Sequence, residues 1–277
     1  MRQEFCRTVA VLFVLAFAAV ISGRASDEAD EEKVRSARLR DMQRVASALK
    51  VEARVDGEFQ PVAPVEGARF RFNHPKTNCD DATVWLWGAT RRPMALLTLS
   101  GTWPTNTPIG SWSYELSSLT TSPLRASGIG DWTWTAAAGK LVFEDLPDAP
   151  AAADTAARRL RQMKDLSRRF NGQGLYGPKL EEHVELRVLP TPLHTYHDEA
   201  QHVREGALFA LVEATNPEAV LMIELVDDGG KNVWKYAFNR ISSGQIRGRL
   251  DDKEVWTSGP SGLEEADEAY YLVIRRM

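Results

Sequence analysis

The sequence predicts an α+β fold made by tandem duplication of one unit, a helix followed by a five- or six-stranded antiparallel meander. The first observation is a repeated segment: residues 112–134 match residues 234–256 without a gap, at an offset of 122. Tryptophan makes up only 8 of the 277 residues, so matched Trp and Tyr positions in one register indicate a duplication. The second observation is the helical pattern that opens each unit. We expect the two copies to pack about a pseudo-twofold axis, as in a homodimer.

Residues 1–25 have the features of a signal peptide. A short basic start precedes an apolar run of 14 residues (8–21), and small residues at Gly23 and Ala25 form a cleavage site. The run is shorter than the roughly 20 residues that span a bilayer. The sequence therefore predicts export to the periplasm, the cell envelope or the medium, with an uncleaved membrane anchor as the alternative. Residues 26–32 form an acidic leader.

The composition of the mature chain is that of an ordinary globular protein. Cleavage removes three basic residues and one acidic residue, so 31 basic and 37 acidic side chains give a net charge of −6. That balance argues against a general nucleic-acid binder. Cys79 is the only cysteine of the mature chain, so no internal disulfide is expected and core burial must supply the stability.

The first copy is expected to span residues 33–146. Apolar residues at spacings of three and four predict a helix from about Glu32 to Lys50. Short β-branched and aromatic runs separated by turn residues then predict strands. They are expected at residues 68–73, 83–87, 94–99, 112–119, 124–126 and 140–143.

A Pro- and Ala-rich linker, residues 147–153, leads to the second copy, residues 154–277. Its helix is expected to begin at Asp154 as N-cap and to end at Asn171 and Gly172. Strands are expected at residues 184–189, 208–212, 220–225, 233–241, 246–250 and 271–274. In each copy we expect the apolar stripe of the helix to lie on a sheet and its arginines to face water.

Three short motifs resemble sequences of an uncharacterised family of exported bacterial proteins. They are the Leu-Arg-Xaa-Met pattern of both helices, Glu-Leu-Arg-Xaa-Leu-Pro at residues 185–190 and Gly-Ala-Leu-Phe at residues 206–209. The resemblance covers mainly the second copy and implies no activity. The order of elements is also similar to that of cystatin-like and nuclear-transport-factor-like folds, a likeness that carries no function by itself.

A histidine-rich segment is the clearest candidate for a metal site. His194, His197 and His202 fall within nine positions, and Asp198 lies between them, so these four side chains would supply zinc ligands. The spacing matches no established metal motif, and nearby prolines favour a loop. The alternative is a solvated connection with no cofactor, which is the interpretation we adopt.

Aromatic residues are the second candidate. The first copy holds six of the eight tryptophans, and two of them, Trp103 and Trp132, have no counterpart in the second copy. A tryptophan that is matched in both copies is expected to serve the fold. If any tryptophan is exposed and binds a ligand, we therefore expect it to be one of these two.

No motif for acyl transfer or phosphate binding is present, so an enzyme is the less favoured interpretation. The sequence predicts an exported, non-enzymatic binding or structural module. Its ligand would be a protein, a peptide or a glycan, held in the groove between the copies or on the Trp-rich first copy. The alternative is a metal-binding protein or metal-dependent hydrolase that uses the segment from His194 to His202.

Overall fold

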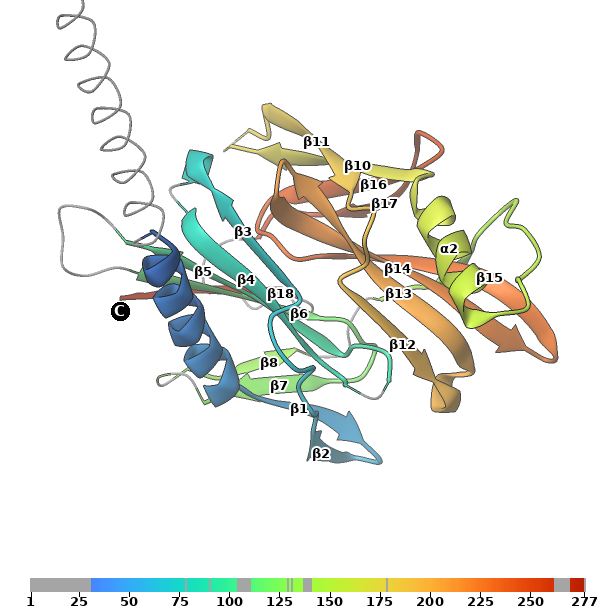
Figure 1. The fold of residues 1–277 in the computed structure, drawn as a ribbon, viewed down its shortest axis with the longest axis horizontal. Helices are drawn as coiled ribbons and strands as arrows, with labels where there is room; N and C mark the ends of the chain where they lie inside the picture. The colour runs from blue at the N-terminus through green and yellow to red at the C-terminus, as the bar shows by residue number, and fades with distance from the viewer. Residues whose placement is uncertain are drawn as a thin grey trace, which may run out of the picture. The chain divides into compact units, whose positions relative to one another are not determined.

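A computed structural model gives the fold of this chain (Figure 1). It describes residues 31–277 apart from residues 78, 90, 104–110, 129, 131, 137–140, 178, 262–269 and 277. The chain separates into two compact units, residues 1–44 and residues 45–277. The described part of the first unit is helical, in a helix that spans residues 31–48 and so continues into the second unit. A helix over these residues was predicted, and its existence is confirmed.

The predicted fold class is wrong. The second unit is built mainly of strands, which form three antiparallel sheets. It is not a tandem of two helix-plus-meander units. Besides the end of helix 31–48, α2 (Ala156–Ser167) is the only α-helix among the described residues of this unit. The reason is that segments expected to be loops or helix ends, such as residues 50–61 and 170–176, pair as strands.

A four-stranded sheet has the strand order β2-β1-β7-β8, and a five-stranded sheet has the order β18-β6-β5-β4-β3. The strands of the first are β1 (Lys50–Val55), β2 (Glu58–Pro61), β7 (Leu124–Ser127) and β8 (Trp134–Ala136). The strands of the second are β3 (Phe70–His74), β4 (Cys79–Trp87), β5 (Ala95–Thr102), β6 (Ser111–Ser118) and β18 (Tyr270–Arg276). The short 3-10 helix η1 (Pro75–Thr77) joins β3 to β4.

The largest sheet has nine strands in the order β17-β16-β10-β11-β13-β14-β15-β9, and β12 also pairs with β13. Its strands are β9 (Glu144–Asp145), β10 (Phe170–Tyr176), β11 (Glu182–Val188), β12 (His194–Asp198), β13 (Val203–Glu213), β14 (Asn216–Asp228), β15 (Lys231–Arg240), β16 (Gln245–Leu250) and β17 (Lys253–Ser258). The 3-10 helix η2 (Glu199–Gln201) follows β12. The predicted hairpins therefore exist, as β4–β5 and β13–β14.

Helix α2 covers one face of the nine-stranded sheet (Figure 1). Met163 and Leu166 are buried there, as the apolar stripe predicted. The N-cap is Thr155, whose hydroxyl accepts from the backbone N–H of Arg158 at 3.4 Å, so the prediction of Asp154 as cap is wrong. The expected helix end at residues 171–172 is wrong as well, because those residues lie inside β10.

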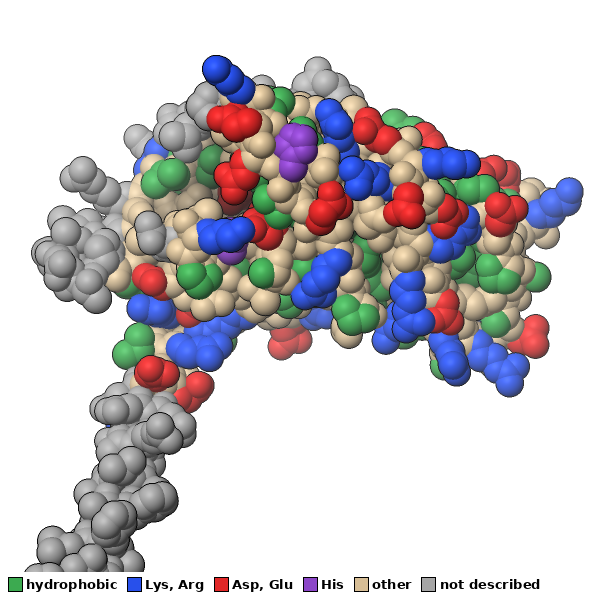
Figure 2. Space-filling model, turned by 90° about the horizontal axis from the view of Figure 1, so that it is seen from above, with side chains coloured by type: hydrophobic (Ala, Val, Ile, Leu, Met, Phe, Trp, Pro, Cys, Tyr) green, Lys and Arg blue, Asp and Glu red, His purple; other side chains and the backbone are tan. Residues whose placement is uncertain are grey.

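The other face of the nine-stranded sheet packs against the five-stranded sheet. Buried apolar residues from both sheets form this second core, among them Val84 and Leu96 of the five-stranded sheet and Leu208, Val220 and Met222 of the nine-stranded one. Burial on both faces explains why the hairpin strands are apolar almost throughout. On the face shown in Figure 2, acidic and basic side chains are interspersed and do not gather into a region of one sign.

Strand pairings of the four- and five-stranded sheets recur in the nine-stranded sheet at a nearly constant offset. Phe72 pairs with Ala82, and 124 positions later Tyr196 pairs with Gly206. Offsets of 121 to 124 likewise relate Thr83–Leu99 to Ala207–Ile223, Leu99–Tyr114 to Ile223–Tyr236, and Val51–Ala126 to Gly172–Gly248. The counterpart of β3 is thus β12, and not β11, which the sequence comparison had matched to it.

One edge of the five-stranded sheet and one edge of the nine-stranded sheet are each formed by a strand from the opposite half of the chain. The C-terminal strand β18 pairs with β6, and β9 pairs with β15. The prediction that residues 140–143 and 271–274 close their own copies is therefore wrong. Residues 141–143 are not a strand, residue 140 lies outside the described residues, and residues 271–274 belong to the sheet of the first half.

Candidate functional site: a polar cleft between two sheets

A cleft of about 340 Å³ opens between the five-stranded sheet and the nine-stranded sheet. One wall is formed by the inner face of β3, β5, β6 and β18, and the other by residues at the ends of β10, β14 and β15. Its lining residues are Phe72, Thr77, Cys79, Thr98, Ser100, Thr102, Ser111, Ser113, Glu115, Tyr176, Asn216, Glu218, Ser242, Ser243 and Ile274.

Hydroxyl groups cover the wall that β5 and β6 provide. Thr98 lies opposite Glu115, and Ser100 lies opposite Ser113, while a third pair, Thr102 with Ser111, continues the row. Residues two apart in a strand share a face, so these side chains form one polar surface. Strands whose other face is apolar thus present hydrogen-bonding groups to the cleft.

Glu218 is the most buried carboxyl group of the cleft, with 3 % of its surface exposed. The side-chain amide of Asn216 donates to its Oε1 at 2.5 Å. Burial raises the pKa of Glu218 to about 7, because an ionised carboxylate loses its hydration there, and the nearby charge of Glu213 acts in the same direction. Hydrogen-bond donors around the carboxyl group lower the pKa only in part.

Glu115 is the second carboxyl group. It accepts a hydrogen bond from the phenol of Tyr270 at 2.5 Å. Burial raises the pKa of Glu115 to about 7, the charge of Glu218 raises it further, and Arg240 opposes the rise. Two nitrogens of the Arg240 guanidinium donate to the single backbone carbonyl oxygen of Ser242, and the guanidinium lies 4.4 Å from the centre of the Tyr270 ring. The two carboxyl groups of the cleft therefore influence each other.

One buried polar atom of the cleft, Oγ1 of Thr98, has no hydrogen-bond partner within the described part of the chain. Thr98 is 3 % exposed, so water does not reach it freely. The hydroxyl groups of Tyr176 and Ser242 lie at Glu218, where their hydrogen bonding to the carboxyl group lowers its pKa. Buried polar groups are normally paired, and unpaired ones at a cavity indicate a missing partner such as a ligand or an ordered water.

Two glycines place Tyr176 at the cleft. A Cβ atom on Gly174 would lie 2.7 Å from its ring, and one on Gly244 would lie 2.4 Å from it. The ring therefore occupies space that any larger residue at these positions would fill. Burial raises the pKa of Tyr176, so its hydroxyl stays a neutral donor and acceptor.

The equivalent space beside the nine-stranded sheet is filled. At an offset of 124, Phe72 and Ser100 correspond to Tyr196 and Glu224. The phenol of Tyr196 donates to Oε1 of Glu224 at 2.9 Å, and Arg92 binds both carboxylate oxygens at 2.7 and 2.5 Å. The hydrogen-bonded side chains of Tyr196, Glu224 and Arg92 thus fill the space beside the nine-stranded sheet. Phe72 and Ser100, which are smaller and uncharged, leave the corresponding space beside the five-stranded sheet open as the cleft.

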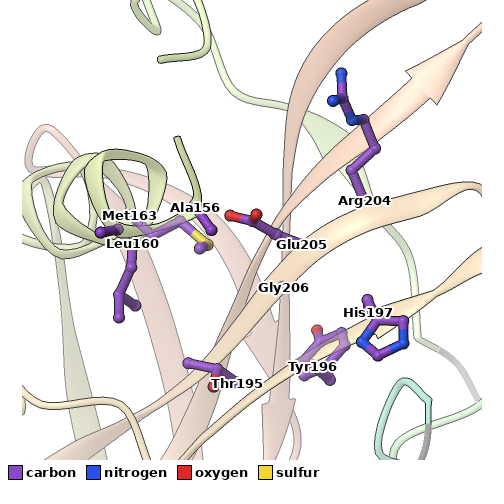
Figure 3. A pocket seen from close by; sticks show the side chains of 10 residues that line it. Ala156, Leu160, Met163, Thr195, Tyr196, His197, Arg204, Glu205 and Gly206 are labelled. Carbon is purple, nitrogen blue, oxygen red and sulfur yellow. The ribbon is translucent and has the colours of Figure 1, made fainter. Parts of the chain in front are cut away.

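A second cavity, of about 410 Å³, lies between α2 and the strands β12 and β13 (Figure 3). Leu160 and Met163 form its apolar side, and Thr195 and His197 lie across from them. Figure 3 shows Glu205 directed from β13 towards α2, where its carboxylate pairs with Arg159 at 2.5 Å. The one carboxyl group in the described lining of this cavity is already paired with an arginine, so the cavity has fewer groups than the cleft that could bind a polar ligand.

The predicted metal ligands do not come together. His194, His197 and Asp198 lie in strand β12, where His194 and His197 point to opposite faces, and His202 is exposed after η2. Asp198 is buried and accepts from the backbone N–H of Arg92 at 3.2 Å. Burial and the charge of Arg69 lower the pKa of His194. Among the described residues, no three His, Cys, Asp or Glu side chains are grouped as metal ligands would be.

The two candidate tryptophans occupy different surroundings. Trp132 is 7 % exposed and packs against Tyr114 and Tyr271, with ring centres 6.1 and 5.8 Å away, so the expected exposure is not found. Trp103 is half-buried, and its ring meets that of Trp112 edge-on at 5.3 Å. Neither residue lines the cleft.

Comparison with protein-family models, with curated proteins and with solved structures finds no match. No described helix has the length and apolar character needed to cross a bilayer. The function must therefore be argued from the cleft itself. Glu115 and Glu218 did not emerge from the sequence as candidates, although one signal was present: polar residues at alternate positions from Thr98 to Thr102 and from Ser111 to Glu115.

Proposed function

We propose that this chain is an exported, non-enzymatic binding module whose small polar ligand occupies the cleft between the five- and nine-stranded sheets. The observation that carries the proposal is the buried, unpartnered Oγ1 of Thr98 in a cavity that also holds two carboxyl groups, those of Glu115 and Glu218. Such an atom costs about 1–3 kcal/mol when it stays unpaired, so a ligand that pairs with it binds favourably.

The size of the cleft favours a small ligand. Its volume of about 340 Å³ lies at the lower end of the range of small-molecule sites, about 300–1,000 Å³. A folded protein partner would not enter this volume, whereas a single sugar ring or a short peptide group would fit it. The cleft lies between the five- and nine-stranded sheets, a position compatible with the groove that the sequence predicted between copies.

The remaining parts of the proposal rest on the sequence and on the strand pairings. The apolar run and small residues within residues 1–25 support export. The recurrence of pairings at offsets of 121 to 124 supports a gene duplication as the origin of the two halves. The short motifs of the second half support membership of the uncharacterised exported family.

Filling the cleft tests the proposal. Ser113→Tyr places a large side chain in the row opposite Ser100, whereas Thr135→Tyr makes the same kind of change at an exposed position of β8. A library of small sugars, amino acids, amines and dipeptides is screened by thermal unfolding with the natural chain and both variants. A ligand present at 100 times its Kd stabilises the folded protein by about 2.7 kcal/mol, which is readily detected.

The expected result is at least one compound that raises the Tm of the natural chain and of Thr135→Tyr but not of Ser113→Tyr. Two outcomes would overturn the proposal. One is that no compound of the library raises the Tm, and the other is that every shift persists in Ser113→Tyr, which would place the ligand elsewhere.

A further inference from the structure

The charge of the cleft narrows the class of ligand. We propose that the ligand is a small organic ammonium compound, held between the carboxyl groups of Glu115 and Glu218. This inference rests on the proposed function, because it concerns the same cleft, and it adds the chemistry that the ligand must bring.

The described lining of the cleft contains two carboxyl groups and no Lys, Arg or His side chain. Neither Glu115 nor Glu218 forms a salt bridge with a described residue, although twelve such pairs occur elsewhere in the described chain. Buried carboxylates are normally paired with a cation. A cationic ligand would supply the partner that the protein does not.

The described groups around the two carboxyl groups do not neutralise both of them, so a cationic ligand can act as their counter-ion. Tyr270 donates to Glu115 and Arg240 acts on it from a distance. Glu218 has neutral partners alone, the hydroxyl groups of Ser242 and Tyr176 and the amide of Asn216, among the described residues. Glu213, which also acts on Glu218, is paired with Lys76 and adds little net charge. Two carboxylates then face the single guanidinium of Arg240, so the local charge is negative when both are ionised, which favours a cation.

The two carboxyl groups are specific to this side of the molecule. At the offset that relates the paired strands, Glu115 corresponds to Ala237, because their partners Thr98 and Met222 are equivalent. Glu218 corresponds to Met94, the residue just before the equivalent β5 and β14 pairings begin. Both carboxyl groups thus stand where the other half has apolar side chains, so the common fold does not require them.

The uncharged part of the lining also suits an ammonium group. Oγ1 of Thr98 has no partner among the described residues and can accept an N–H hydrogen bond. Phe72 and Tyr176 add aromatic rings, which attract cations through their negatively charged faces. A neutral polyol would use the hydroxyl groups but would leave the two carboxyl groups without a counter-ion.

Matched amines and alcohols test the inference. The probes are 1,3-diaminopropane, 1,4-diaminobutane and 1,5-diaminopentane, each compared with the diol of the same length, by titration calorimetry near neutral pH and at low salt. We expect at least one diamine to bind, and its diol to bind at least about tenfold more weakly, because a hydrogen bond to a charged group contributes more than one between neutral groups.

Isosteric variants locate the site. Glu115→Gln and Glu218→Gln are each expected to weaken the diamine at least about tenfold, since each removes one counter-ion. Glu254→Gln is the matched control, because Glu254 is exposed on β17 and does not line the cleft. It should leave the affinity unchanged.

Proton release gives a readout that needs no variant. Both carboxyl groups have a pKa of about 7, so near neutral pH each is partly protonated before binding. An ammonium ligand stabilises the ionised forms, and protons must leave as it binds. Calorimetry in buffers of different ionisation enthalpy should therefore show a release of roughly one proton per ligand.

Each other outcome overturns a defined part of the reasoning. If a neutral compound binds and Ser113→Tyr abolishes that binding while no diamine binds, the cleft is a binding site but the ammonium inference is wrong. Equal binding of diamine and diol, or binding without proton release, also rejects it. If no probe or library compound depends on residue 113, the proposed function fails together with this inference.

Discussion

Replacement of Glu218 by glutamine gives the sharpest test of the electrostatics of the cleft. The folded protein holds the proton of this carboxyl group more tightly than the unfolded chain does, because the pKa is about 7 when folded and 4.5 ordinarily. The stabilising effect of the raised pKa is therefore complete below about pH 4.5 and is lost as the pH rises through about 7. A pKa difference of about 2.5 corresponds to about 3 kcal/mol.

Glutamine keeps the shape of the protonated carboxyl group and does not titrate. We therefore expect Glu218→Gln to gain about 3 kcal/mol relative to the natural chain between about pH 5 and about pH 8.5. Urea unfolding followed by tryptophan fluorescence at several pH values measures this change, and any constant cost of the substitution cancels between the two pH values. If the free energies of unfolding of Glu218→Gln and of the natural chain changed in parallel with pH over this range, the reasoning would be refuted. The control variant Glu254→Gln should show this parallel behaviour.

Three further predictions concern the rest of the second unit. Gly206→Ala should cost about 1–3 kcal/mol of stability, because its Cβ would lie 2.3 Å from an aromatic ring of β12, whereas Gly259→Ala has open space and should be nearly neutral in the same urea titration. Arg92→Gln should cost about 3–5 kcal/mol, since it leaves the fully buried carboxylate of Glu224 unpaired, and a loss below about 1 kcal/mol would contradict the network. Burial raises the pKa of Cys79 to about 11, so alkylation by iodoacetamide at mildly alkaline pH should be roughly 100-fold slower than for an exposed thiol, and a comparable rate would show that the thiol is not buried.

Local patterns predicted the elements better than the sheets they join. Helix 31–48, helix α2 and the two central hairpins lie where apolar periodicity placed them. The fold class was wrong because strand pairing is non-local: β18 and β9 leave the half of the chain in which they occur. Periodicity within a window contains no information about which edge a strand will join.

The histidine-rich segment shows why neighbours in sequence need not gather around one point in space. Two prolines suggested a loop, yet residues 194–198 pair with β13 as the counterpart of β3. A strand sends residues three apart to opposite faces, so His194 and His197 do not face one common metal position. The carboxyl groups of the cleft were missed for a related reason, since Glu115 and Glu218 lie 103 positions apart and only the tertiary structure brings them to one cavity.

The pairing of β18 with β6 has a consequence for biosynthesis. The hydrogen bond from Tyr270 to Glu115 spans 155 positions, so a nascent chain cannot complete the five-stranded sheet until β18 has been made. Such long-range pairing slows folding and leaves the strand edge of β6 open in the interval.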